Sequence, residues 1–163
     1  MKILIVTQYY YPEQFQINEI APSLVAKGHD VTVLTGLPNY PIGKLFDGYD
    51  DPKHLEEDIQ GVHVIRCKQY PRGHGIKQLI MNYCSFMINS KRKIKNLPSD
   101  FDIVFGYELS PITSISAGIS YKNRYRVPFV MYVLDLWPVY ALGQLKHNSN
   151  PLYLVLIIIS RKM

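Results

Sequence analysis

Ile3-Leu-Ile-Val6, followed by Thr7-Gln-Tyr-Tyr-Tyr-Pro-Glu13, is the stretch that decides the fold. Its first four residues form a continuous apolar run, which indicates a strand covered on both faces, as in the centre of a parallel sheet. Ligands of open α/β sheets bind outside the carboxyl ends of the strands, where the strand order reverses. A first strand commonly lies at such a switch point, so we predict that Gln8–Glu13 forms one wall of a binding site.

Four more apolar segments read as strands, and helical patterns separate most of them. The predicted strands are Val31–Leu34, Val62–Cys67, Phe101–Gly106 and Pro128–Leu134, with Val62–Cys67 nearer an edge because it alternates more. Between Lys44 and Asp58 we expect irregular chain, then a turn over Asp58–Gly61. Strands that alternate with helices predict an α/β fold: a Rossmann-like, doubly wound, five-stranded parallel sheet.

The first predicted helix has an apolar stripe at helical spacing, at Ile17, Ile20, Ala21, Leu24 and Val25. Pro22 predicts a kink or a late start, and Asn18 is a candidate cap for a late start. Gly28 fits a left-handed C-terminal cap.

Three later helices are predicted from their stripes and caps. The long one runs from Ile76 to Lys95, and Leu97-Pro98 stops it. Ser110 and Pro111 read as the N-cap and first residue of a helix that ends near Tyr121. The last helix begins near Asn150-Pro151. The predicted apolar face of the long helix comprises Ile76, Leu79, Ile80, Tyr83 and Met87.

Composition bounds the class of protein. The chain has 163 residues, the size of one domain, and is 47% hydrophobic and 19% charged, which is typical of a globular chain. Its two cysteines are unpaired in sequence, so neither a disulfide framework nor a zinc site is predicted. The five histidines are scattered, which argues against a Ser-His-Asp triad. No glycine fingerprint follows the first strand and no P-loop is present, so no cofactor is predicted.

Carboxylates follow three of the predicted strands: Glu13, Glu108 and Asp135. The carboxyl ends of parallel strands share one edge, so these groups can bind hydroxyls or move protons there. Each can instead be a solvated or capping carboxylate. Asp135 precedes Trp137, the only tryptophan, and a carboxylate beside an indole suits a sugar, because one binds hydroxyls while the other packs on C–H faces.

The end of the long helix is basic, with Lys91, Arg92, Lys93 and Lys95 in its last turns. These cations complement the helix dipole, and they can also rest on anionic lipid headgroups at a membrane surface. The net charge of +5 fits either reading. Nucleic acid is not predicted, because no recognition motif accompanies the charge.

Several segments together resemble the N-terminal half of family 4 glycosyltransferases of the bacterial surface-polysaccharide, aminosugar-transferase-like subgroup. They are Met1–Thr7, Tyr10–Glu13, Ile17–Ala21, Lys27–Val33, Thr35–Pro41 with Gly43, and Tyr132 with Asp135–Pro138. The Asn39-Tyr-Pro41 and Asp135-Leu-Trp-Pro138 pieces are the more specific ones. The chain departs from the pattern at Pro22 and at Val139-Tyr140.

The resemblance implies the N-terminal, acceptor-side half of a two-domain GT-B fold over residues 1–163. By the same resemblance, the absent half would bind the nucleotide-sugar donor, a UDP sugar. Transfer would proceed with retention of configuration and without a metal. The acceptor would be a lipid-linked sugar at the cytoplasmic face of the membrane. The pathway would be capsule, O-antigen or exopolysaccharide synthesis.

For the site, the resemblance and the strand-end positions together single out ten residues. The predicted catalytic residues are Asp135 and Glu108, and the predicted substrate-binding residues are Gln8, Tyr10, Tyr11, Glu13, Asn18, Asn39, Tyr40 and Trp137. The apolar run Leu152–Ile159 is too short to span a bilayer, and no capping or turn residue follows it, so we expect the chain to be part of a longer protein. The alternatives are a non-catalytic Rossmann-like or flavodoxin-like binding module and an epimerase or dehydrogenase fragment.

Overall fold

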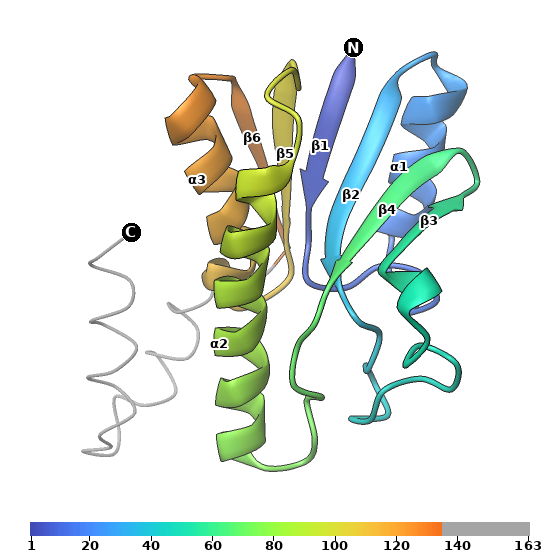
Figure 1. Ribbon diagram of the computed structural model, residues 1–163, viewed down its shortest axis with the longest axis vertical. Helices are drawn as coiled ribbons and strands as arrows, with labels where there is room; N and C mark the ends of the chain where they lie inside the picture. The colour runs from blue at the N-terminus through green and yellow to red at the C-terminus, as the bar shows by residue number, and fades with distance from the viewer. Residues whose placement is uncertain (135–163) are drawn as a thin grey trace.

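The apolar run Ile3–Val6 lies within β1 (Lys2–Val6), an interior strand of a six-stranded sheet (Figure 1). The computed structural model describes residues 1–134. The other strands are β2 (Asp30–Gly36), β3 (Glu56–Ile59), β4 (Val62–Cys67), β5 (Ile103–Glu108) and β6 (Phe129–Val133). The helices are α1 (Ile17–Ala26), α2 (Ile76–Lys93) and α3 (Ser116–Tyr125), with 3₁₀ turns η1 (Pro52–Leu55), η2 (Ile94–Asn96) and η3 (Ile112–Ile115).

The strand order is β3-β4-β2-β1-β5-β6, and every neighbouring pair is parallel except β3 and β4. From β1 the chain builds outward through β2 and β4, then returns to the other side of β1 with β5 and β6. The order therefore reverses between β1 and β5. The prediction that the first strand lies at the switch point is confirmed.

Alternate residues of β1 face two separate cores, one on each side of the sheet. Leu4 and Val6 pack with Phe86 of α2 and Tyr121 of α3. Ile3 and Ile5 instead lie in the cluster that covers the α1 side. Both faces of the sheet are thus covered by helices (Figure 1), which explains why this strand reads as an unbroken apolar run.

The edge strand β3 was not predicted, so the sheet has six strands instead of the predicted five. β3 is antiparallel to β4 and forms an edge, and its sequence Glu-Glu-Asp-Ile has low strand propensity. Charged residues are tolerated there because an edge strand faces water. His63 of β4 lies 3.3 Å from Glu56 and 3.2 Å from Asp58. The predicted turn over Asp58–Gly61 is accordingly shorter, with left-handed backbone at Gln60 and Gly61.

The start predicted for the helix at Ser110 was also wrong, as was one of the two alternatives for the first helix. α1 begins at Ile17 with Pro22 inside it, so the alternative of a late start is wrong, and Asn18 does not cap the helix. Ser110 has a φ of 122° and makes no capping bond. The turn η3 follows it instead, and α3 begins at Ser116. The C-terminal cap at Gly28 is confirmed by its φ of 84° and its bond to the Val25 carbonyl.

The buried face of α2 differs from the predicted one. Its buried residues are Asn82, Phe86 and Ser90, whereas Ile76 and Ile80 are 63% and 45% exposed. The reason is that the first half of α2 extends beyond the ends of the strands (Figure 1), so no sheet covers it. No helix within residues 1–134 is long and apolar enough to cross a bilayer.

Candidate functional site

The loops that leave β1, β2, β4 and β5 meet at the carboxyl edge of the sheet, at the lower end in Figure 1. The β1 loop spans 7–16, the β2 loop 37–51 and the β4 loop 68–75. Buried polar side chains join these three loops to each other and to α2. The edge is therefore a fixed arrangement of loops around the switch point, in the position where open α/β sheets bind ligands.

Glu13 fastens the β2 loop to the β1 loop. Its Oε1 accepts hydrogen bonds from the backbone N–H groups of Asn39, at 2.8 Å, and Tyr40, at 2.7 Å. Its Oε2 is buried without a hydrogen-bond partner among residues 1–134. Burial raises the pKa of the Glu13 carboxyl to about 7, against the opposing effect of the amides of Asn39 and Tyr40. The Asn18 side chain supports the same loop, since its Nδ2 donates to the Glu13 carbonyl at 2.6 Å.

A second set of bonds links Gln8 and Asn39 through Asn82, which sequence reasoning missed. Gln8 Nε2 donates to Asn82 Oδ1 at 2.8 Å and to Gln69 Oε1 at 3.2 Å. Asn82 Nδ2 donates to the Tyr70 carbonyl at 2.6 Å and lies 3.5 Å from Asn39 Oδ1. The available signal was an amide residue four positions before Phe86, on the inward face of α2.

The three consecutive tyrosines divide between core and surface. Tyr10 is 1% exposed and packs in the α1-side core, so it supports the wall from behind. Tyr9 is also buried, and its ring stacks on Phe15 with centroids 5.3 Å apart. Tyr11 is 43% exposed, and Tyr40 of the neighbouring loop is 37% exposed. Tyr11 and Tyr40 are thus the predicted binding tyrosines whose rings reach the surface.

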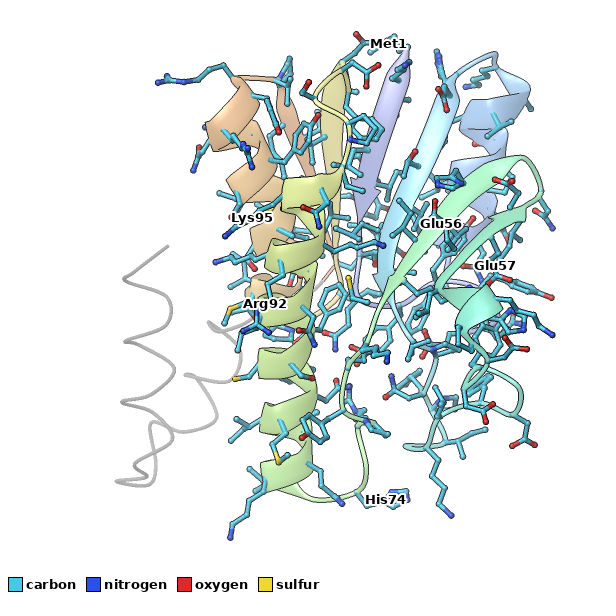
Figure 2. All side chains as sticks on the ribbon, in the orientation of Figure 1. Met1, Glu56, Glu57, His74, Arg92 and Lys95 are labelled. Atoms are coloured by element: carbon cyan, nitrogen blue, oxygen red, sulfur yellow. The ribbon has the colours of Figure 1, made fainter. Side chains whose placement is uncertain are left out.

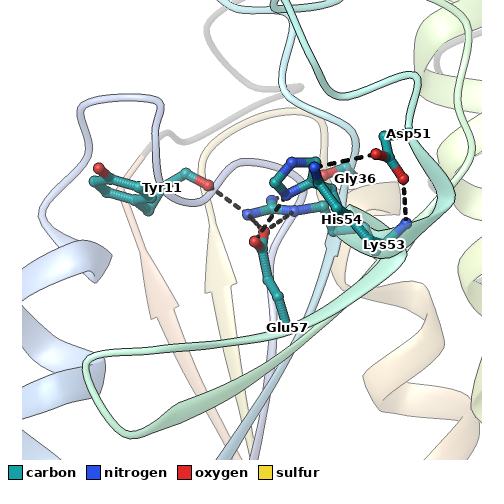
Figure 3. A network of polar contacts seen from close by, with 7 residues as sticks. Tyr11, Gly36, Asp51, Lys53, His54 and Glu57 are labelled. Carbon is teal, nitrogen blue, oxygen red and sulfur yellow. Dashed lines mark hydrogen bonds and ion pairs between the residues drawn. The ribbon is translucent and has the colours of Figure 1, made fainter.

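Arg66 of β4 is a second residue that the sequence did not identify. Its side chain is fully buried, and Nη2 donates to the Tyr11 carbonyl at 2.7 Å and to Glu57 Oε1 at 2.9 Å. Glu57 in turn contacts His54 Nδ1 at 2.9 Å. Figure 3 shows Tyr11, Gly36 and Glu57 converging in this network. The antiparallel edge strand that sequence analysis missed therefore holds the β1 loop in place.

Glu108 and Gln8 lie on the same side of the sheet, toward α2 and α3. Glu108 is the last residue of β5 and is 1% exposed. The β1–β5 register pairs Val6 with Gly106, so Gln8 follows β1 at the level of Glu108. Ser114 of η3 is buried as well. The structure thus places these two predicted residues at the ends of neighbouring strands, one on each side of the switch point. Asp135 and Trp137 lie outside the described residues.

The predicted basic residues lie elsewhere on the surface. Lys91, Arg92 and Lys95 line a groove of about 390 Å³ between α2 and α3, together with Arg124 and the apolar Ile88, Ile94, Tyr121 and Tyr125. Lys93 lines a separate depression beside β4. In Figure 2, Arg92 of α2 and Lys95 of η2 lie beside the sheet, whereas His74 lies beyond the other end of α2, near the loops.

The chemistry available at the carboxyl edge is hydrogen bonding, aromatic contact and, through Glu13, proton exchange near neutral pH. Amide side chains and tyrosines recognise hydroxyl-rich ligands. Within residues 1–134, no three His, Cys, Asp or Glu side chains gather in a way that could hold a metal ion.

Comparison with known proteins identifies the fold. No family model and no curated protein matches the chain. Among solved structures, the calicheamicin glycosyltransferase CalG4 aligns with a TM-score of 0.52 and 14% identity, over 91% of this chain and 37% of that chain. The C-terminal domain of the PF1911 hydrogenase from Pyrococcus furiosus aligns with a TM-score of 0.49 and 18% identity, over 80% of this chain and 90% of that chain.

The predicted fold class is confirmed by the sheet and by the likeness to CalG4. The chain has a Rossmann-like α/β fold with a mostly parallel sheet, similar to that of a GT-B glycosyltransferase. At this identity the likeness shows the fold alone. Membership of family 4 and of its polysaccharide subgroup stays a prediction.

Proposed function

We propose that this chain is the acceptor-binding half of a retaining, nucleotide-sugar-dependent glycosyltransferase that acts in capsule, O-antigen or exopolysaccharide synthesis. The observation that carries the proposal is the carboxyl edge at the switch point. Where a nucleotide-binding sheet has a glycine-rich turn, the β1 loop here presents tyrosines, an amide and a buried carboxylate. The GT-B-like fold supports the same reading.

The chemistry of glycosyl transfer explains why this would be half of an enzyme. Departure of a nucleoside diphosphate needs cations or backbone dipoles that stabilise the charge formed on it. Donor and acceptor must also be held together by two walls of a cleft. We assign the donor, a UDP sugar, to a second α/β half. The acceptor is assigned to the edge where Tyr11 and Tyr40 are exposed and where Gln8 and Asn39 hold the loops in place, with Trp137 as the proposed sugar-packing ring.

Two carboxylates are proposed to act near the reacting centre. Asp135 would accept a hydrogen bond from the acceptor hydroxyl, and Trp137 would pack on the sugar ring. Glu108 is proposed to assist from the neighbouring strand end, where it lies level with Gln8.

The acceptor is proposed to be a lipid-linked sugar, with the protein resting on the cytoplasmic face of the membrane. Lys91, Arg92 and Lys95 form the basic rim of the α2–α3 groove, and Lys93 lies on the adjoining surface. Each Lys or Arg near an anionic surface contributes on the order of 1 kcal/mol to binding. A cluster of this size would hold the protein at the membrane reversibly.

The test measures sugar binding by saturation-transfer NMR, with p-nitrophenyl N-acetylglucosaminide as an acceptor mimic and uridine, which carries no phosphate, as a probe for the donor nucleoside. We expect the chain to bind the sugar and not uridine, and Asp135→Ala to abolish sugar binding. Asp100→Ala is the matched control, because Asp100 is exposed and pairs with Lys2 at the opposite edge of the sheet.

The same variants, placed in a protein that contains both halves, test catalysis. Transfer should be lost in Asp135→Ala and kept in Asp100→Ala. Undiminished transfer in Asp135→Ala refutes its role. Binding of uridine instead of the sugar favours a nucleotide-binding module.

A further inference from the structure

Arg72, in the loop after β4, is held by groups from three different elements. Its Nη1 donates to the Tyr9 hydroxyl at 3.1 Å, and its backbone N–H donates to Asn39 Oδ1 at 2.9 Å. The guanidinium carbon lies 5.5 Å from the ring centroid of Tyr40 and 5.7 Å from that of Tyr83. The side chain is therefore held between the β1 loop, the β2 loop and helix α2.

No carboxylate neutralises this cation within the part of the chain that the structure describes. The buried Arg66 pairs with Glu57, whereas Arg72 takes part in no ion pair there. Burial disfavours the charge, but the tyrosines at 9, 83 and 40 favour it, and the pKa of Arg72 is raised. Guanidinium has five N–H donors, and one of them has a partner in residues 1–134.

A fixed arginine of this kind is suited to binding an anion. Aromatic rings hold the guanidinium plane, so little side-chain entropy is lost when a ligand binds. Its fork of N–H groups matches two phosphate oxygens. A cation that served packing alone would have its donors used by protein acceptors, as those of Arg66 are.

We propose that Arg72 binds a phosphate or diphosphate group of the ligand that occupies the carboxyl edge. This inference rests on the proposed function, since it names the anionic part of the acceptor. The ligand would reach Arg72 past the exposed ring of Tyr40.

The face of α2 that carries Tyr83 is apolar, and this face indicates which kind of molecule would carry the phosphate. Ile76, Ile80 and Tyr83 are spaced by four and three residues, so they share one face of α2. Ile76 and Ile80 are exposed, and Tyr83 carries the ring beneath Arg72. A phosphate attached to a hydrocarbon chain would contact both features, whereas a soluble sugar phosphate would contact the arginine alone.

The experiment measures affinity by calorimetry for two probes, inorganic pyrophosphate and geranyl diphosphate. Arg72→Gln should weaken both at least tenfold, because a charge-assisted pair of hydrogen bonds is lost. Arg72→Lys keeps the positive charge but loses the paired N–H groups of the guanidinium, so its affinity should lie between those of the wild type and Arg72→Gln. Arg126→Gln is the matched control, since Arg126 is an exposed arginine at the end of α3 and lines neither the carboxyl edge nor the α2–α3 groove. Far-UV circular dichroism and urea midpoints check that each variant is folded.

The two probes separate the sources of the phosphate. The phosphate belongs to a lipid if geranyl diphosphate binds more tightly than pyrophosphate and if Ile80→Ser removes this difference in affinity. Equal affinities for the two probes assign the phosphate to a soluble ligand. The proposal is overturned if the wild-type chain binds neither probe, if Arg72→Gln binds as wild type, or if Arg72→Gln loses no more affinity than Arg126→Gln. If Arg72→Gln does not fold and Arg72→Lys does, an affinity of Arg72→Lys equal to that of the wild type overturns the proposal. Binding of pyrophosphate through Arg72 without binding of the sugar mimic refutes the proposed function and leaves the anion site.

Discussion

Replacement of Glu13 by Gln removes a buried charge without changing the shape of the side chain. In the native protein Oε1 receives two backbone N–H groups, and a Gln carbonyl can accept the same bonds. The variant therefore keeps the connection between the β1 and β2 loops and abolishes the titration at this position.

The expected size follows from the pKa of the native carboxyl, raised by burial from 4.5 to about 7. Between these values the native protein holds a proton that the unfolded chain has released, so stability falls as the pH rises. One pKa unit corresponds to about 1.4 kcal/mol, so the free energy of unfolding of the wild type loses about 2–3 kcal/mol between pH 5 and pH 8 through this one group. The variant should lack this loss.

Urea unfolding of both proteins at half-unit steps from pH 5 to pH 8 tests the prediction. Relative to wild type, Glu13→Gln should become more stable by about 2–3 kcal/mol across this range. Glu19→Gln, which removes an exposed carboxylate from α1, reports the effect of charge alone. A difference between wild type and Glu13→Gln that does not change with pH, or that changes with the opposite sign, refutes the reasoning.

Two further predictions concern the same loops. Arg66→Met should lower the free energy of unfolding in urea by about 3 kcal/mol, because it leaves Glu57 and the Tyr11 carbonyl without their buried donor. Arg66→Met with Glu57→Met should cost less than Arg66→Met alone, and an equal or larger cost would contradict this account. Gly43→Ala should cost about 1–2 kcal/mol more than Gly48→Ala in the same assay. Both glycines have positive φ, but a Cβ on Gly43 would lie 3.0 Å from the Gly73 carbonyl oxygen, whereas nothing lies within 4 Å of one on Gly48. Equal costs would show that the loop moves aside.

Apolar patterning was sufficient to predict the five strands that are buried or parallel. Ile3–Val6 is covered on both faces, and its composition carries that information directly. Apolar patterning did not predict β3, because its Glu and Asp residues have low strand propensity and show no apolar alternation. Apolar patterning also predicted the wrong buried face for the first half of α2. Apolar residues at helical spacing, such as Ile76 and Ile80, indicate an apolar face of a helix, but they do not show whether the sheet is long enough to cover that face.

The sequence predicted where the site lies on the sheet, but not the contacts within it. Strand ends and the switch point follow from chain order, and the structure brings Gln8 level with Glu108 as that logic requires. Individual contacts depend on how the loops cross, which no local pattern encodes. Asn82, Arg66 and Arg72 lie 74, 55 and 63 residues from their partners Gln8, Tyr11 and Tyr9.

The loops explain why several predicted ligand contacts hold the protein together instead. Loops packed at the end of a sheet carry backbone groups without strand partners, and each buried one needs a hydrogen bond. Glu13, Asn18 and Asn39 meet that need here. The side chains of Glu13, Asn18 and Asn39 are consequently occupied within the protein, whereas Tyr11 and Tyr40 are exposed and Arg72 lies beside Tyr40 with unused N–H donors. A ligand at this edge would meet the second group directly. Substitutions in the first group should alter affinity by loosening the wall, and they should lower the stability of the loops at the same time.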